Sequence, residues 1–208
     1  MLSSYRLGDL VLLNLTDTEK DELKNDHPNT IGYDYILNSN KIELYIDKID
    51  IITNIVLTHI QKNINLLPKD IENSSVLHLR LGDVVGGNKW YETTKRPLDI
   101  NYLKSHMPTT KIYVIGKCFF AKPSSTNYEE CIELSNKYLE DVINTFNAIH
   151  FDGGSADIDL CCAIKAKHFI QGRGYFSKLI VEIRKKLNLE NIETHVYNRN
   201  RRIFYKKI

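Results

Sequence analysis

Short apolar runs alternate with amphipathic segments from Val76 onward, and this alternation constrains the fold more than any other feature of the chain. Five stretches have the character of strands, namely "SVLHLRL", "KIYVIG", "AIHF", "KHFIQG" and "ETHVYN". Strands that alternate with helices are typical of β-α units around a parallel sheet. We therefore expect an α/β fold with a doubly wound, mostly parallel sheet.

Between the strands we expect helices over residues 99–106, 128–146, 157–166 and 176–187. The helix over 157–166 is apolar nearly all round, so it is expected in the interior. In two others the apolar residues recur with the period of one helix face. The expected buried faces are Ile132, Leu139, Val142 and Phe146 in the helix over 128–146, and Phe176, Leu179, Ile180, Ile183 and Leu187 in the helix over 176–187.

The first 74 residues differ in character from the rest of the chain. They contain a candidate strand, "RLGDLVLLNL", and a helical pattern over residues 47–64, separated by a polar, turn-rich stretch. A segment of this length is too short to bury a substantial core alone. We therefore expect residues 1–74 to form a cap on the sheet that residues 75–208 build.

The composition is that of a globular protein and not of a disordered chain. Of 208 residues, 42% are hydrophobic and 26% are charged. A net charge of only +2 makes nucleic acid an unexpected partner for the chain as a whole. The tail "NRNRRIFYKKI" interleaves basic and aromatic residues, so binding to nucleic acid or an anionic surface is an alternative there to an ordinary charged terminus.

Cysteine and histidine usage, with the N-terminal sequence, bears on cellular location. The four cysteines lack the paired spacing of a zinc site, the histidines have no metal-ligand spacing, and free thiols in a reducing compartment are expected. The apolar stretch near the N-terminus is too short for a signal peptide or a membrane span. We expect a cytoplasmic protein without a metal or a membrane span, and leave a homo- or hetero-oligomer open.

The tetrapeptide "RLGD" occurs twice, at residues 6–9 and again inside "HLRLGD" at residues 78–83. In the second copy, strand alternation places His78 and Arg80 on the same side. Gly82 permits a sharp turn after the strand, and Asp83 lies at its mouth. The planar guanidinium of Arg80 suits a phosphate, and the alternative is a structural ion pair with Asp83.

Two later segments place glycines between a strand and a helix, where the backbone can approach a ligand closely. The first, "HFDGGSADIDL", offers the carboxylates of Asp157 and Asp159 to hydroxyls or a base, the alternative being a plain helix N-cap at Ser155 or Asp157. The second, "QGRGYFSKL", leads into a helix N-terminus suited to an anion. Its alternative is a glycine-rich connector with Ser177 as a cap.

"HLRLGD" resembles the H-x-R-x-G-D motif of fucosyltransferases, above all the α-1,2-fucosyltransferases and their relatives. "GGSADIDLCCAIKAKHFIQGRGYFSKLIVEI" is similar to that family's second signature, and the two motifs come in the family's order. The resemblance covers about Val76 to Lys186. It implies the Rossmann-like nucleotide-binding half of a GT-B glycosyltransferase, which binds a GDP-sugar donor and requires no metal or other cofactor.

The resemblance also implies roles for single residues. Arg80 matches the arginine that contacts the donor diphosphate, His78 the histidine near the nucleotide, and Asp83 the aspartate that shapes the turn. Asp157 or Asp159 matches the acid that reads the base or the ribose. The other residues expected at the donor site are Gly82, Arg173, Gly174, Tyr175, Phe176 and Ser177.

The chain departs from the family pattern in two ways. Many members have two adjacent arginines where this chain has Leu79-Arg80-Leu81, and Arg173 is the candidate for the missing charge. Residues 1–74 are short for an acceptor-binding half, so the acceptor site is expected to be reduced, supplied by another subunit, or absent.

We expect an inverting, metal-independent glycosyltransferase that moves a sugar, fucose by resemblance, from a GDP-sugar to a glycan or other hydroxyl acceptor. Asp83, or Asp9 in the first "RLGD", is the candidate base that deprotonates the acceptor. The alternative is a non-catalytic or partner-dependent module that binds nucleotide-sugars.

Overall fold

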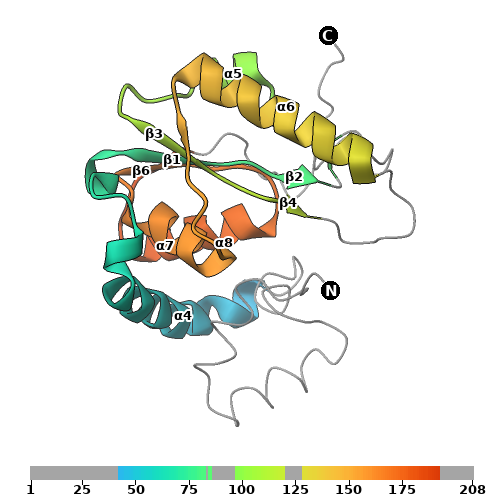
Figure 1. Cartoon of the computed structure of the whole chain (residues 1–208). Coiled ribbons are helices and arrows are strands. Elements are labelled where there is room, and N and C mark those ends of the chain that lie inside the picture. The colour runs from blue at the N-terminus through green and yellow to red at the C-terminus, as the bar shows by residue number, and fades with distance from the viewer. Residues whose placement is uncertain (1–41, 83, 86–96, 120–127, 193–208) are drawn as a thin grey trace.

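The computed structural model describes residues 42–82, 84–85, 97–119 and 128–192, and its centre is a five-stranded, all-parallel sheet (Figure 1). The spatial order of the strands is β5-β3-β1-β6-β7. Counted along the chain within this sheet, that order is 3-2-1-4-5, which is the order of Rossmann-type doubly wound sheets. The strands are β1 (Ser75–His78), β3 (Ile112–Ile115), β5 (Ile149–His150), β6 (His168–Ile170) and β7 (Asn191–Ile192).

Helices cover both faces of the sheet (Figure 1). On one face lie α5 (Ile100–Lys104) and α6 (Tyr128–Phe146), and on the other lie α7 (Ala156–Lys165) and α8 (Tyr175–Lys186). A hydrophobic core lies on each face of the sheet. Successive residues of β1 point to opposite faces, so Val76 packs in the core on the α7–α8 side and Leu77 in the core on the α5–α6 side. The expected α/β fold with a parallel sheet is therefore confirmed.

The expected helix before the sheet is α4 (Ile42–Lys62). It packs against α7 and α8, where Val56 and Ile60 are buried, so it covers helices and does not lie directly on the sheet. Two short 3-10 turns, η1 (Ile64–Leu66) and η2 (Ile71–Asn73), lead into β1. The candidate strand "RLGDLVLLNL" lies outside the described residues, and the division at residue 74 stays a prediction.

The expected strands appear with shorter bounds than the apolar runs suggest. The run "SVLHLRL" divides after His78, and Leu81–Gly82 forms a separate strand, β2, that pairs in parallel with β4 (Cys118–Phe119). The side-chain alternation nevertheless continues, since Leu79 and Leu81 are buried in the same cluster as Leu77. The stretch "ETHVYN" lies outside the described residues, directly after β7.

Three expected helices are confirmed as helices with buried faces, but one buried residue is wrongly assigned. Ile132 of α6 is 41% exposed, because the helix turns Cys131, Ser135 and Val142 inward instead. Ser135 can lie in this buried stripe because its Oγ accepts a hydrogen bond from the N–H of Gly82, 3.0 Å away. In α7 and α8 the expected apolar residues from Ile158 to Ile164, and Phe176, Leu179, Ile180 and Ile183, are buried.

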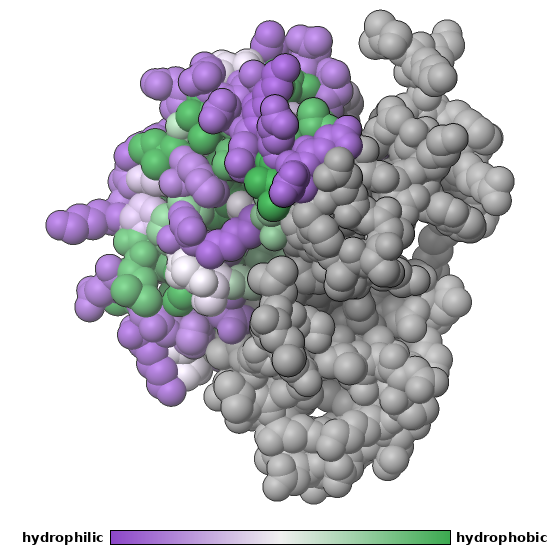
Figure 2. Space-filling view, turned by 45° about the vertical axis from the view of Figure 1, so that its right-hand side comes forward, coloured by the Kyte–Doolittle hydropathy of each residue, from purple (hydrophilic) through white to green (hydrophobic). Residues whose placement is uncertain are grey.

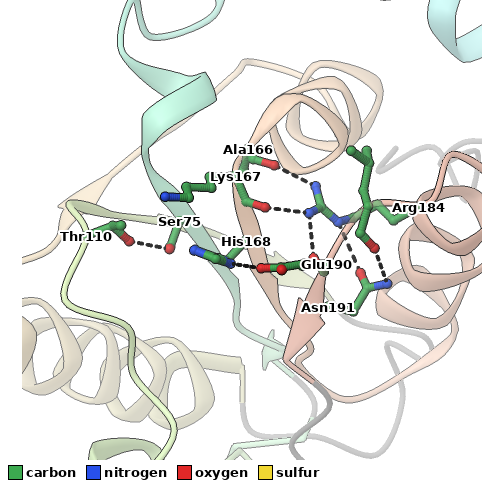
Figure 3. Close-up of polar contacts among 9 residues, drawn as sticks. Ser75, Thr110, Ala166, Lys167, His168, Arg184, Glu190 and Asn191 are labelled. Carbon is green, nitrogen blue, oxygen red and sulfur yellow. Dashed lines mark hydrogen bonds and ion pairs between the residues drawn. The ribbon is translucent and has the colours of Figure 1, made fainter.

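Arg184 of α8 is fully buried in the interior, which the sequence analysis missed (Figure 3). Its Nη1 donates to the carbonyls of Ala163, Ile164 and Ala166 at 2.7–3.1 Å. Its Nη2 donates to the carbonyls of Lys167 and Glu190, and its Nε donates to Asn191. Burial lowers the pKa of Arg184 to about 10. The guanidinium thus caps the C-terminal end of α7, the negative end of its dipole.

The described surface is mixed in character. On the face in Figure 2, apolar areas alternate with hydrophilic side chains. The most exposed large apolar side chain is Leu66 in η1, at 59%. Within the described ranges we find no helix that combines the length and the apolar character needed to cross a membrane. The cysteines are free thiols, and three of them are buried.

Candidate functional site

The two motif segments meet where the strand order reverses, at the carboxyl ends of β1 and β6. From the central β1 the chain proceeds outward to β3 and β5, and then returns to β6 on the other side. Because the connections leave β1 and β6 in opposite directions, this is the point where doubly wound sheets bind ligands. His78 ends β1, and residues 171–174 connect β6 to α8.

His78 is held by the first turn of α8. It is only 6% exposed, and its Nδ1 lies 2.5 Å from Oγ of Ser177, which is fully buried. The rings of His78 and Phe176 are 5.0 Å apart at their centroids and inclined by 50°. Three expected site residues from two distant segments are therefore in direct contact.

Gly172 allows the backbone of the β6–α8 segment to press against the end of β1. A Cβ at this position would lie 2.0 Å from the carbonyl oxygen of His78 and 2.7 Å from its Nδ1. No side chain fits at that separation, and the carbonyl is backbone that cannot turn aside. The close approach explains why a glycine follows β6. The sequence had predicted that Gly172 lets a ligand come near, whereas the group that its Cβ would meet is His78.

Arg80 lies beside the N-terminus of α8. Gly174 is the N-cap residue of that helix and has φ +94°, a conformation that favours glycine. The position of a Cβ on Gly174 would be 3.8 Å from Nη1 of Arg80. A positive side chain thus stands next to the end of α8 where unpaired N–H groups and the helix dipole are also positive.

Gly82 ends β2 and begins a turn in which its carbonyl accepts a hydrogen bond from the N–H of Val85. Its φ is +87°, and its N–H donates to Ser135 of α6. This hydrogen bond holds the turn on the α5–α6 side of the sheet. His78 and Arg80 lie on the other side, next to α8. Asp83 lies outside the described residues, and so does the side chain of Tyr175.

Arg173 is 9% exposed and acts on the α6 side. Burial and the charge of Asp99 raise the pKa of Tyr138, whereas the charge of Arg173 lowers it. The hydroxyl of Tyr138 donates to the carbonyl of Leu98 at 2.6 Å. The charge of Arg173 therefore acts on Tyr138 of α6. That Arg173 and Arg80 bind the same ligand stays a prediction.

The glycine-acid loop after β5 is organised by Asp159. This carboxylate is 5% exposed, and its Oδ1 accepts a hydrogen bond from the N–H of Gly153 at 3.1 Å. Burial raises the pKa of Asp159 to about 6, against the hydrogen bond from Gly153 and the charge of Lys117. Ser155 is the N-cap of α7 and accepts from Ile158, so the cap alternative is right for Ser155. Asp157 follows in the first turn.

Lys117 is a charged residue at the carboxyl edge of the sheet, the edge where the parallel strands end, and the sequence analysis missed it. It lies two residues after the end of β3, and its Nζ is 2.6 Å from Oδ1 of Asp152, which also accepts a hydrogen bond from the N–H of Gly154. The preceding Gly116 has φ +143°, and a Cβ there would lie 2.3 Å from the carbonyl oxygen of Leu79. A glycine directly after an apolar strand was the available signal for this close approach.

The described carboxyl edge therefore has two groups of polar residues. One comprises His78, Arg80 and the start of α8, and the other comprises Lys117, Asp152 and Asp159 around the start of α7. Across the parts of the chain that the structure describes, no three His, Cys, Asp or Glu side chains gather as metal ligands would. Comparison with protein-family models, with curated proteins and with solved structures found no significant match.

Proposed function

We propose that the chain is an inverting, metal-independent glycosyltransferase that binds a GDP-sugar donor at the carboxyl ends of β1 and β6. The position of Arg80 carries this proposal. A guanidinium beside a helix N-terminus brings two positive groups together, and a bound anion with more than one negative oxygen would stabilise both. A nucleoside diphosphate at the switch point of a parallel sheet meets that requirement.

The neighbouring residues suit a diphosphate. Gly174 brings the backbone close to Arg80, and no side chain of this N-cap residue caps the start of α8, where first-turn N–H groups of a helix can bind an anion. Asp159, at the start of α7, is the candidate residue to accept a hydrogen bond from a ribose hydroxyl or from a donor group of the base. Guanine and fucose themselves rest on the motif resemblance.

In the proposed reaction the oxygen of an acceptor hydroxyl attacks the anomeric carbon of the sugar from the face opposite the diphosphate. A new glycosidic C–O bond forms as the bond from the anomeric carbon to the phosphate oxygen breaks, and GDP leaves with that electron pair. Arg80 and the start of α8 would stabilise the negative charge that develops on GDP. The acceptor proton passes to a carboxylate, for which Asp83 and Asp9 are the sequence candidates.

A binding experiment and a turnover experiment test this proposal together. Metal-free calorimetric titrations with GDP, GMP, UDP and ADP should give selective binding of GDP. Mass spectrometry of the chain incubated with GDP-fucose should then detect slow release of free sugar, because water can replace the acceptor. GDP binding without any sugar release or transfer would favour the non-catalytic or partner-dependent module. Absence of GDP binding would contradict both.

A further inference from the structure

Ser177 does not stand in the place expected of a residue that contacts the donor phosphates directly. Its side chain is fully buried, although its position in the first turn of α8 is close to the proposed diphosphate. The hydroxyl instead lies 2.5 Å from Nδ1 of His78. Any effect of Ser177 on a ligand therefore has to pass through the imidazole.

The direction of this hydrogen bond follows from what the hydroxyl can contact. Among the residues that the structure describes, the bond to Nδ1 is the one hydrogen bond of the Ser177 hydroxyl. A buried hydroxyl has one hydrogen to donate and two lone pairs, and an unused donor is rarer in proteins than an unused lone pair. The hydrogen is thus donated to Nδ1, and a ring that accepts at Nδ1 carries its own hydrogen on Nε2.

The ring is fixed from two further directions. Phe176 packs against it at a centroid distance of 5.0 Å, and the Gly172 backbone leaves no room for even a Cβ beside its carbonyl and Nδ1. Gly172 of the β6–α8 connection, together with Phe176 and Ser177 of α8, therefore determines the orientation of the His78 side chain at the end of β1. Such an arrangement is typical of a residue whose second nitrogen has a defined task.

We propose that Ser177 is a positioning residue that acts through His78. By donating to Nδ1 it keeps the hydrogen of His78 on Nε2, and the fixed orientation and tautomer of the ring in turn set the affinity of the neighbouring donor site. This inference rests on the proposed function, and it deepens it by assigning His78 as a neutral ring of fixed tautomer beside the cationic Arg80.

The first arm of the test needs no ligand. In protein labelled with ¹⁵N-histidine, long-range proton–nitrogen correlation spectra identify which ring nitrogen carries the hydrogen, and His78→Gln assigns the signals. The wild type should have the hydrogen of His78 on Nε2. Ser177→Ala should give a mixture of both forms, and Ser177→Thr, which keeps the hydroxyl, should restore the wild-type pattern. An unchanged pattern in Ser177→Ala would overturn the inference.

The second arm measures GDP affinity by calorimetry. Ser177→Ala should weaken GDP binding by about fivefold to tenfold, the factor that one hydrogen bond contributes. It should cause no further loss in a chain that already carries His78→Gln. Ser74→Ala is the matched control, because Ser74 is a buried serine at the opposite edge whose hydroxyl donates to the carbonyl of Asp70 at 2.8 Å. This control should leave the affinity unchanged.

The outcomes separate this inference from the proposed function. If Ser177→Ala binds GDP like the wild type while Arg80→Ala does not bind, the inference is wrong and the donor site stands. If the two losses from Ser177→Ala and His78→Gln add independently, the coupling between the residues is refuted. If the wild type binds no GDP, the proposed function fails and takes with it the role of His78 toward a diphosphate.

Discussion

Two arginines at opposite edges of the sheet stand in opposite electrostatic settings. Arg184 lies at the amino edge, where its guanidinium donates to five carbonyl oxygens and an Asn side chain around the C-terminal end of α7 (Figure 3). Arg80 lies at the carboxyl edge, beside the N-terminal end of α8. A helix dipole stabilises a cation at the first place and opposes one at the second.

This difference agrees with the proposal that the amino edge serves stability and the carboxyl edge serves binding. Polar groups are joined at both edges, as Asp70 is to Lys111 and Tyr113 at the amino edge and Lys117 is to Asp152 at the carboxyl edge. At the carboxyl edge, glycines bring backbone close to His78 and Leu79, and Asp159 is buried with a raised pKa of about 6. Groups kept at a cost to stability are common at functional sites.

Replacement of Arg184 should have the largest effect on folding. Arg184→Met leaves the buried carbonyls at the end of α7 without their donor, so the free energy of unfolding should fall by about 3–5 kcal/mol. Urea denaturation measures this change. Lys185→Met, at an exposed neighbouring position, should change it by less than about 0.5 kcal/mol. A loss below about 1 kcal/mol in Arg184→Met would refute the capping role.

Replacement of Gly172 tests the packing at the carboxyl edge. In Gly172→Ala the new Cβ meets the His78 carbonyl, so backbone has to move and stability should fall by about 2–3 kcal/mol. The matched variant is Gly154→Ala, where a Cβ would have no neighbour within 4 Å but φ is +78°. Its loss should be about 1 kcal/mol. Equal losses in urea denaturation would mean that the close approach to His78 is unimportant.

Asp159 should lower stability at neutral pH. Its pKa rises from 3.8 to about 6 on folding, so between these values the folded chain holds a proton that the unfolded chain releases. Its contribution to the free energy of unfolding therefore falls as pH rises from about 4 to 6 and stays low above that. Asp159→Asn cannot ionise and can still accept from Gly153, so at pH 7 it should be more stable by about 1–3 kcal/mol.

Denaturation of both chains at pH 4 and pH 7 checks this prediction. The difference between them should be small at pH 4, because the other titrating groups are common to both. Equal stability at pH 7 would mean that burial does not disfavour the Asp159 carboxylate. If the variant is more stable and also binds GDP less well, the carboxylate is kept for binding.

The sequence predicted the parallel α/β fold because apolar periodicity reports burial directly. It could not predict the end of β1 at His78, since "SVLHLRL" alternates uniformly across the point where the chain changes sheets. It also could not predict that Ser135 lies inward, because a serine reads as polar until its partner, the Gly82 N–H, is known. Both the end of β1 and the burial of Ser135 depend on contacts with residues that are distant in the sequence.

The candidate site also has features that the sequence predicted and features that it could not predict. The motif spacing predicted that His78 and Arg80 share one side of the strand, and the structure shows that this is the side of α8. The segment "QGRGYFSKL" indicated Ser177, but not its contact with His78. Arg184 was missed even though it occurs eight residues after Phe176, on the apolar face of the same helix. A charged residue on that face was the available signal, and only the carbonyls around it explain why it can be buried.

The most direct test of the central claim is GDP affinity in Arg80→Ala and in Lys111→Ala, measured by metal-free calorimetry. Lys111→Ala removes an equal charge at the opposite edge of the sheet, where Lys111 pairs with Asp70. We predict that Arg80→Ala weakens GDP binding at least about 30-fold, as expected for loss of a charge-assisted contact, with little change in stability. Lys111→Ala should bind as the wild type does. GDP binding that is equal in the two variants would contradict a donor site at Arg80.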